Sequence, residues 1–395
     1  MKIGFISPYP FSYPGGVQKH ILALKREFEK RGHEVKVICP RDRIPQKREK
    51  DFIFLGGALN IPGNASRASI SLNPVPLTTF QKLKKHSFDI LHFQNFGVFM
   101  PLQILDASKS LYTPFQRKKK EINILTLHAL LDASWVFREI PSISKIFNEY
   151  ILPKFDGVIV VSRPVLSQIK YEGPLEIIPN GVDLDFFSPK GEKIEKFEDK
   201  GKINILFVGR IEKRKGLIYL LRAFEILRKK HQNLRLIIVG DGNKKREMKN
   251  FVKKRKIEDV FFEGKVEEKD LPSYYRSADI CCFPSIQGES FGIVLLEAMA
   301  SGKPIVAFAN QGYKELLKEK EKECLARPKS VAELKEKLEN FILNPSLREK
   351  IGKWGREKAK NYAWEKISEK VLNFYERVIK TKKSVSYTHL TLPTT

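Results

Sequence analysis

Residues 2–39 read KIGFISPYPFSYPGGVQKHILALKREFEKRGHEVKVIC, and this stretch decides the class of fold. A short apolar run, Lys2–Ser7, precedes a helical pattern over Val17–Arg31 and a second apolar run, Glu34–Cys39. Apolar side chains at steps of four, three and four give this helix one buried face: Val17, Ile21, Leu24 and Phe28. Gly32 then supplies a typical helix stop. A strand, a helix and a second strand form the unit from which parallel sheets are built.

The alternation of short apolar runs and helical patterns continues through both halves of the chain. Further runs in the first half are Asp89–Phe93, Asn123–His128 and Gly157–Ser162, and those in the second half are Asn204–Gly209, Leu234–Val239, Val260–Glu263, Asp279–Pro284 and Pro304–Phe308. The halves are separated by residues 188–202, which are polar and charged and lack apolar periodicity. Because 395 residues exceed what one core usually organises, we predict an α/β protein with domains 1–187 and 203–365 and a linker, 188–202.

The end of the chain differs in composition from the rest. A helical run extends from Ser330 to about Lys380. The last residues, Ser384–Thr395, read SVSYTHLTLPTT and lack the lysines and glutamates that are common before them. We interpret residues 384–395 as a non-native tail and exclude them from reasoning about the fold.

The formal net charge of +26 raises the question of an anionic partner. Most lysines alternate with glutamates, as in Lys318–Glu323, which is typical of a solvated surface. No nucleic-acid partner is expected, because the basic residues lack the interleaved aromatic side chains of a stacking platform. An excess without acids occurs in the first half, at Lys82, Lys84, Lys85 and Arg117–Lys120.

The first of these basic clusters suits a membrane surface. Residues 79–85, TFQKLKK, place Phe80 and Leu83 beside three lysines, as in a helix lying at an anionic interface. The alternative is that Phe80 and Leu83 face the core under solvated lysines. No run reaches the ~18 apolar residues that a membrane span needs. We therefore expect a cytoplasmic protein, peripheral on the inner face of the membrane.

No metal site or other cofactor is expected. The cysteines lack paired ligand spacing and are interpreted as small buried hydrophobic residues in a reducing compartment: Cys39, Cys281, Cys282 and Cys324. The sequence Asp183-Leu-Asp185 resembles a metal-binding pair, but it directly follows the turn Asn180-Gly181. We interpret these two aspartates as turn and cap residues.

Two carboxylates frame the sharpest motif, Glu289-Ser-Phe-Gly-Ile-Val-Leu-Leu-Glu297. The first lies on a loop after the run Asp279–Pro284, and the second lies inside the helix that follows. The free amides at that helix start suit a diphosphate, the loop carboxylate suits sugar hydroxyls, and the helical one suits a ribose diol. A capping role for Glu289 and a surface role for Glu297 are the alternative, which the apolar neighbours of Glu297 disfavour.

A basic loop, Gly209-Arg-Ile-Glu-Lys-Arg-Lys-Gly216, follows the first strand of the second half. Arg210 therefore emerges at the carboxyl end of that strand, where open α/β sheets bind ligands, and Lys215 opens the next helix. These two cations can neutralise the charge that builds on a departing diphosphate. A loop that is merely basic is the alternative.

The first half offers two weaker signals. Gly15 and Gly16 precede the helix from Val17, and glycines let backbone amides approach a phosphate or a sugar closely. Their spacing is not the G-x-G-x-x-G of a dinucleotide site. His128 ends the run Asn123–His128 at the edge where a ligand would lie, although a lone histidine there is more often structural.

Taken together these motifs resemble the family 4 glycosyltransferases of GT-B fold, over the chain up to about Lys380. The matching segments are Pro14–Gln18, Thr126–His128, Ile178–Asp183, Gly209–Arg210 with Lys215–Gly216, Gly240–Gly242 and Glu289–Glu297. Within the family the chain looks most similar to phosphatidylinositol α-mannosyltransferases, through Ser7–Phe11 and Gly288–Val294. The resemblance implies two Rossmann-like domains whose parallel sheets face a central cleft, with a last helix, about 366–380, packing back on the first domain.

The resemblance also implies a reaction and a set of residues. It implies metal-independent transfer of a hexose, with mannose as one candidate, from a nucleoside-diphosphate sugar with retention of configuration. Arg210 and Lys215 would hold the diphosphate, and Glu289 the sugar hydroxyls. Glu297 would bind the ribose, and His128 the sugar. Val266 and Glu268 would contact the base of the nucleotide. The further donor-binding candidates are Gly15, Gly16, Arg214, Phe291, Gly292, Ile293 and Val294.

The acceptor side departs from the family pattern. The mannosyltransferases have an aromatic residue before the asparagine of an acceptor loop, whereas this chain has Gly63-Asn64, and Arg67 is one place out of register. The candidate acceptor residues are Tyr9, Gln18, Asn64 and Arg67, for phosphatidylinositol or another sugar or lipid-linked acceptor. A sugar-nucleotide epimerase of similar two-domain fold is the alternative enzyme.

Overall fold

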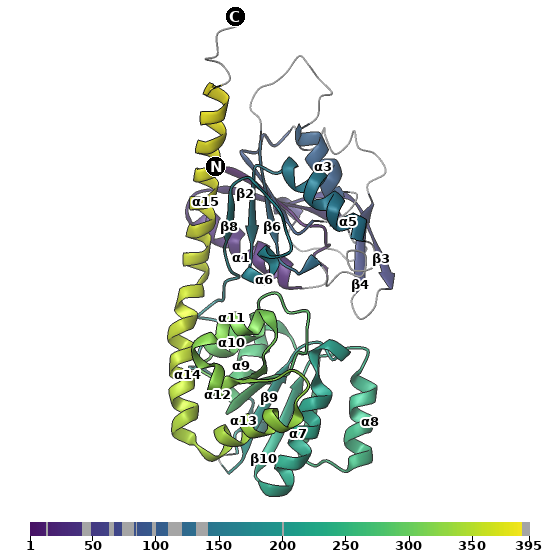
Figure 1. Cartoon of the computed structure of the whole chain (residues 1–395), viewed down its shortest axis with the longest axis vertical. Helices are drawn as coiled ribbons and strands as arrows, with labels where there is room; N and C mark the ends of the chain where they lie inside the picture. The colour runs from purple at the N-terminus through teal and green to yellow at the C-terminus, as the bar shows by residue number, and fades with distance from the viewer. Residues whose placement is uncertain are drawn as a thin grey trace, which may run out of the picture. The chain divides into compact units, whose positions relative to one another are not determined.

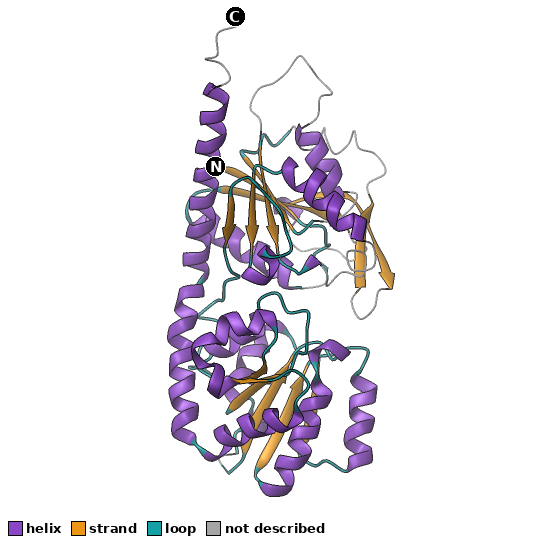
Figure 2. Cartoon of the chain, viewed as in Figure 1, coloured by secondary structure: helices purple, strands orange, loops and turns teal. Residues whose placement is uncertain are grey.

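The structure is a computed structural model, in which the contacts divide the chain into two units (Figure 1). Unit 1 comprises Met1–Pro179 with Trp364–Thr395, and unit 2 comprises Asn180–Ala363. The residues that the structure describes are 1–12, 15–41, 49–62, 67–72, 83, 85–96, 100–109, 121–131, 141–199 and 201–388. In each unit the strands form an inner layer flanked by helices (Figure 2). The prediction of an α/β protein with two parallel-sheet domains is confirmed.

The sheet of unit 1 has the order β4-β3-β2-β1-β5-β6-β7-β8. Its strands are β1 (Lys2–Ile6), β2 (Glu34–Arg41), β3 (Phe52–Pro62), β4 (Arg67–Leu72), β5 (Ile90–Gln94), β6 (Ile122–Leu127), β7 (Gly157–Val160) and β8 (Leu175–Ile177). All neighbouring strands pair in parallel except β3 and β4, which form an antiparallel pair at the edge. Sequence analysis did not find this pair, because the residues involved show no clear apolar alternation.

The helices of unit 1 include the one that the opening sequence predicts. They are α1 (Gly16–Lys30), α3 (Met100–Lys109), α5 (Pro141–Ile146), α6 (Arg163–Leu166) and α15 (Trp364–Thr388). The apolar face of α1 packs with β1 and α15 in one core, where the rings of Phe28 and Tyr375 lie 6.0 Å apart. A Cβ on Gly157 in β7 would lie 2.8 Å from Val378, so glycine permits the close approach of α15.

The sheet of unit 2 is parallel throughout, with the order β11-β10-β9-β12-β13-β14. Its strands are β9 (Ile203–Val208), β10 (Leu234–Val239), β11 (Val260–Gly264), β12 (Ile280–Phe283), β13 (Ile305–Phe308) and β14 (Leu325–Ala326). Its helices are α7 (Leu217–Lys230), α8 (Lys245–Arg255), α9 (Leu271–Ser277), α10 (Ile293–Ala300), α11 (Gln311–Leu317), α12 (Glu321–Cys324), α13 (Val331–Leu343) and α14 (Pro345–Ala359).

The contacts place the unit boundaries at Pro179 and Ala363, so residues 188–202 are counted with unit 2. Within this stretch Phe197 is buried, and its ring lies 5.5 Å from that of Phe261 on β11. One buried aromatic residue produces no apolar periodicity, so the sequence did not indicate that this stretch packs on unit 2. At the other end α15 extends to Thr388, which includes the first residues of the tail that we interpret as non-native.

The expected burial of the cysteines and of the basic stretch 79–85 can be compared with the structure. All four cysteines are buried free thiols, as predicted, and burial raises the pKa of Cys39 and Cys324 to about 12. Leu83 is buried, so the interpretation of this side chain as an interfacial one is wrong, and the alternative that Leu83 faces the core holds. Lys85 is exposed, whereas Phe80, Lys82 and Lys84 lie outside the described residues. No helix in the described part of the chain is long and apolar enough to cross a membrane.

Candidate active site

Two loops of unit 2 meet at the carboxyl ends of neighbouring strands. The first, residues 209–216, follows β9, and the second, residues 284–292, follows β12, which pairs with β9. The backbone N–H of Ile286 donates to the carbonyl of Arg214 at 2.8 Å. Gly216 has φ +69°, and a Cβ there would lie 1.9 Å from the carbonyl oxygen of Pro284. Only glycine therefore allows the two loops to come this close.

Charged side chains from both loops form a compact cluster. Glu289 is mostly buried, and its Oε1 lies 2.9 Å from Arg214 Nη1 and 2.8 Å from Lys215 Nζ. Arg214 also donates to the carbonyl of Gly288 at 3.2 Å. The loop that carries the carboxylate is thus tied to the loop that carries the cations.

Arg210, the other cation expected at the diphosphate, forms an ion pair with Glu212. Its Nη2 lies 3.4 Å from Glu212 Oε1, and half of its side chain is exposed. The same Glu212 oxygen lies 2.7 Å from Arg214 Nε, and Glu212 is buried. Sequence analysis quoted this acid within the basic loop without assigning it a role. The sequence feature that could have indicated an ion-pair role for Glu212 is its position as the one carboxylate among the four basic residues of this loop.

The start of α10 adjoins this cluster in sequence. Gly292 precedes the helix with φ +107°, and a Cβ there would lie 2.8 Å from the ring of Tyr313. Phe291 is buried, while Ile293 and Val294 form the first turn, which contains no acidic residue. The first amides of a helix have no partner within the helix and carry partial positive charge, so this end suits an anion.

Glu297 lies one turn further along α10 and is buried. The hydroxyl of Tyr275 on α9 donates to Glu297 Oε2 at 2.8 Å. Burial and the charge of Glu297 raise the pKa of Tyr275, so this tyrosine stays a donor. The apolar neighbours of Glu297 predicted its burial, but nothing in the sequence identified Tyr275 as its partner.

The residues proposed for the base follow an outer strand. Val266 and Glu268 come after β11, which β10 separates from β9. Val266 is partly buried, and Glu268 is exposed at the start of a short 3₁₀ turn, Glu268–Asp270. They therefore follow a different strand from the loop that carries Lys215.

In unit 1 the candidates gather around the loop after β1. Gly15 caps α1 and Gly16 begins it. Gln18 is buried and donates from Nε2 to the carbonyl of Pro10 at 3.1 Å, so its amide holds this loop. Burial raises the pKa of Tyr9, whose hydroxyl shares a hydrogen bond with Asn95. Asn64 lies outside the described residues, and Arg67 is described only as backbone, at the start of β4.

His128 follows β6 and is held by residues that end the adjacent strand β5. Its Nε2 lies 2.7 Å from Gln94 Oε1, and its backbone N–H donates to Asn95 Oδ1 at 2.7 Å. The His128 ring meets that of His20 edge-on at 4.5 Å, and His20 contacts Trp364 at 5.1 Å. Sequence analysis missed Gln94, Asn95 and His20, because neighbouring strand ends can be recognised only once the strand order is known.

Two family models match the chain, one over each half. The model described as Glycosyltransferase Family 4 matches residues 14–186, and the model described as Glycosyl transferases group 1 matches residues 190–358. A phosphatidyl-myo-inositol mannosyltransferase of Mycobacterium leprae is 30% identical over 381 residues, 96% of this chain and 97% of that protein. The chain belongs to glycosyltransferase family 4.

Solved structures show how widely the fold of this glycosyltransferase is shared. Sucrose-phosphate synthase from Thermosynechococcus elongatus aligns with a TM-score of 0.75 at 21% identity, covering 96% of this chain and 99% of that one. Anabaena HepE in complex with UDP and glucose aligns with a TM-score of 0.70 at 17% identity, covering 95% and 99%. The chain is a hexosyltransferase of GT-B fold, and the epimerase alternative is not favoured.

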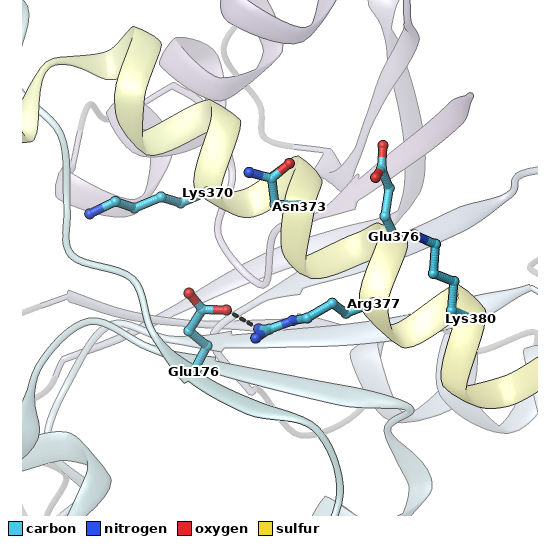
Figure 3. Close-up of a pocket in the computed structure, with 6 residues that line it drawn as sticks. All are labelled: Glu176, Lys370, Asn373, Glu376, Arg377 and Lys380. Atoms are coloured by element: carbon cyan, nitrogen blue, oxygen red, sulfur yellow. Dashed lines mark hydrogen bonds and ion pairs between the residues drawn. The ribbon is translucent and has the colours of Figure 1, made fainter.

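The glycosyltransferase also has a groove outside this set of residues. On unit 1 about 330 Å³ of space lies between α15 and β8, lined by Glu176, Lys370, Asn373, Glu376, Arg377 and Lys380 (Figure 3). Arg377 forms an ion pair with Glu176 across this space. The groove holds charges of both signs at its rim and none of the residues expected in catalysis.

The aspartates that resemble a metal-binding pair belong to a turn. Asp183 Oδ1 accepts hydrogen bonds from the backbone N–H groups of Asp185 at 3.2 Å and of Phe186 at 3.0 Å. The Asp183 carboxylate therefore acts as a turn residue, as predicted, and Asp185 takes part through its backbone N–H. Within the described ranges of the glycosyltransferase, no group of three or more histidine, cysteine, aspartate or glutamate side chains is placed to hold a metal ion.

Proposed function

We propose that the enzyme transfers a hexose from a nucleoside-diphosphate sugar with retention of configuration and without a metal ion, and that mannose is the hexose. The observation that carries this proposal is the cluster formed by Arg214, Lys215 and Glu289 just before α10. A diphosphate needs cations and helix amides, and a hexose needs a carboxylate that accepts from its hydroxyls. The two loops supply all three kinds of group.

The reaction follows from the charges that change. An acceptor hydroxyl oxygen forms a bond to C1 of the hexose, and the bond from C1 to the diphosphate oxygen breaks. The electron pair leaves with the diphosphate, which takes up the acceptor proton on the same face of the sugar. Negative charge grows on the leaving oxygen, so Arg210, Arg214, Lys215 and the α10 amides stabilise the transition state more than the ground state. Glu289 orients the hexose through its hydroxyls.

The remaining donor residues complete the proposed site. Glu297 would accept from the ribose hydroxyls, in addition to the hydrogen bond from Tyr275. Val266 and Glu268 would contact the base, and His128 would contact the transferred sugar. The hydrogen bonds that His128 makes to the end of β5 support this role, because they fix the position of the ring.

The proposed acceptor is phosphatidylinositol, with Tyr9 and Gln18 in its pocket. The support comes from relatives that match nearly the whole chain and are named phosphatidyl-myo-inositol mannosyltransferase. A lipid acceptor requires the enzyme to work at a membrane surface, and the lysines of residues 79–85 would supply peripheral, charge-driven docking.

The experiment is a two-part assay in the presence of a chelator. Thermal shifts with uridine- and guanosine-diphosphate sugars identify the donor, because a bound ligand raises the melting temperature by mass action. Transfer of the labelled hexose is then measured with phosphatidylinositol and with phosphatidylglycerol, which has the same charge but no inositol. We expect transfer to phosphatidylinositol alone, with the anomeric configuration of the donor retained.

Each part of the proposal can fail separately. The donor assignment fails if no nucleotide sugar raises the melting temperature. Turnover that a chelator abolishes and Mg²⁺ or Mn²⁺ restores would contradict metal independence. Equal transfer to both lipids would exclude inositol as the recognised group.

A further inference from the structure

Glu212 stands out because it is an acid placed among the cations of the proposed diphosphate site. It is 5% exposed, and its Oε1 contacts Arg214 Nε at 2.7 Å and Arg210 Nη2 at 3.4 Å. Its backbone N–H donates to the carbonyl of Arg210, and its carbonyl accepts from the N–H of Lys215, both at 3.0 Å. The tight turn of the loop therefore fixes the carboxylate against two guanidinium groups.

The contacts of Glu212 orient one arginine more firmly than the other. Arg214 is held at two points, by Glu212 at Nε and by Glu289 at Nη1. The contact of Arg210 with Glu212 is longer, at 3.4 Å, and half of the Arg210 side chain is exposed. Glu212 and Glu289 thus position Arg214 from two sides.

The charge of Glu212 also acts on any anion in the site. The cluster contains three cations, Arg210, Arg214 and Lys215, and two carboxylates, Glu212 and Glu289. A nucleoside diphosphate carries several negative charges, and each of these carboxylates repels it. Glu289 binds the hexose hydroxyls in the proposed mechanism, whereas the ion pairs of Glu212 among the described residues are all with Arg210 and Arg214.

We propose that Glu212 is a positioning residue whose negative charge lowers the affinity of the site for the nucleoside diphosphate product, and so sets the rate of product release. This inference rests on the proposed function. Without Glu212 the three cations would hold the spent diphosphate more tightly after the hexose has left. Product release limits turnover in many enzymes, so a carboxylate that lowers product affinity raises kcat. The same carboxylate keeps Arg214 aligned for the leaving group.

The test is Glu212→Gln, which keeps the size of the side chain and removes its charge. Calorimetry with UDP and GDP measures the affinity for the bare product, and steady-state kinetics measure kcat, KM and product inhibition. We expect the product Kd and the inhibition constant to fall about tenfold, because repulsion between unit charges about 10 Å apart, at an effective dielectric constant near 20, corresponds to roughly this factor. We expect kcat and donor KM to fall together, with a smaller change in kcat/KM.

A matched control separates a local effect from a change in net charge. Glu225 on α7 is also largely buried and lies near Lys229 and Arg255, away from the two loops. Glu225→Gln removes the same charge from the same unit and should leave the product Kd unchanged. If Glu212→Gln does not fold, Glu212→Met provides a second uncharged variant, because a buried charge can often be replaced by an apolar side chain of similar volume.

The outcomes distinguish this inference from the proposed function itself. If neither UDP nor GDP binds the wild-type enzyme, the proposed function fails. If one of them binds the wild type and binds the folded Glu212 variant with equal or lower affinity, the inference about Glu212 is wrong. A purely structural role would lower the melting temperature and slow turnover without tightening product binding.

Discussion

At the scale of single residues, the charged groups of the candidate site already have partners in the chain. Glu289 contacts Arg214 and Lys215, and Glu297 accepts a hydrogen bond from Tyr275. A donor that binds here must replace or share these contacts, so binding exchanges one set of charge-assisted bonds for another. Substitutions are therefore expected to affect binding and turnover unequally.

The first residue-level prediction concerns two lysines on the same turn. Lys215 contacts Glu289, whereas Lys213 is exposed, and no contact between Lys213 and Glu289 occurs among the described residues. We expect Lys215→Ala to lower kcat on the order of 10²-fold or more, because it removes a preorganised group that meets growing charge. Lys213→Ala should leave kcat within a factor of two or so. Equal losses in the two variants would show that only the overall basicity of the loop matters.

The second residue-level prediction separates the two carboxylates of the motif. Glu297→Gln should mainly weaken binding of the bare nucleoside diphosphate, because this residue is proposed to meet the ribose. Glu289→Gln should keep that binding and slow hexose transfer, on the order of 10²-fold, because it is proposed to meet the reacting sugar. Calorimetry with the bare nucleotide and transfer kinetics distinguish the two effects. If both variants lose nucleotide affinity and transfer rate to the same extent, the division of roles is wrong.

At the scale of elements, the periodicity of the sequence predicted the central strands of both sheets and the helix α1, but not the edge strands β3, β4, β8 and β14. The apolar steps of α1 and the restart at β9 lie where they were expected, because local patterning determines them. The β3–β4 pair and the Tyr275–Glu297 contact were not predicted. Both depend on which elements become neighbours, and this is a property of the tertiary structure. The sequence proposed Arg214, Lys215 and Glu289, which contact one another in the structure, but it did not identify Tyr275 as the partner of Glu297.

The loops of the candidate site depend on a glycine that a matched substitution can test. Gly216 and Gly302 have nearly the same left-handed backbone, at φ +69° and +68°. A Cβ at Gly216 meets the Pro284 carbonyl at 1.9 Å, whereas at Gly302 the nearest atom is Pro189 Cβ at 3.5 Å. Both alanine variants incur about 1–2 kcal/mol of backbone strain. Gly216→Ala should lower the melting temperature clearly more and also weaken nucleotide binding; similar melting temperatures would contradict the clash.

A second element-level prediction concerns the contact between α7 and α13. Glu339 on α13 pairs with Lys230 at 2.8 Å and His231 at 2.9 Å, and these hydrogen bonds lower its pKa to about 2. Because the pKa is lower in the folded state, the stabilisation is present at neutral pH and is lost as pH falls from about 4.5 toward 2.

We therefore expect Glu339→Gln to lower the melting temperature at pH 7 by ~2–4 °C, as for an ion pair worth about 1 kcal/mol. The difference from wild type should shrink as the pH is lowered through this window. Glu336→Gln, at an exposed position on the same helix, is the control and should match wild type at every pH. A difference in melting temperature between Glu339→Gln and wild type that stays constant from pH 7 to pH 3 would rule out the ion pairs as its origin.

At the scale of the whole molecule, the dominant property is the net charge of +26. A charge of this size attracts any anionic surface at low salt, so binding to vesicles alone does not identify a docking site. A docking site has to be located by comparing variants that remove the same net charge from different parts of the chain. The structure adds one constraint, since Leu83 is buried and does not contribute an interfacial side chain.

The prediction at this scale compares two triple variants. Replacing Lys82, Lys84 and Lys85 by serine should strongly reduce sedimentation with anionic vesicles, with a steep dependence on salt. Replacing Lys318, Lys320 and Lys322 in unit 2 removes the same charge from a stretch where lysines alternate with glutamates. That variant should sediment like wild type. If both triple variants lose binding equally, attraction is a property of the whole surface and the docking site is excluded.

The return of the chain to unit 1 through α15 has a consequence for synthesis on the ribosome. The core of unit 1 contains Trp364, Ile367 and Phe374, which are translated after all of unit 2. Unit 2 can therefore complete its sheet first, while the first 179 residues lack the apolar side chains that α15 contributes to their core. During that interval the part of the core that packs against α15 is open to chaperones or to other nascent chains. A gene fusion that joins these 179 residues directly to a foreign second unit would make the exposure permanent.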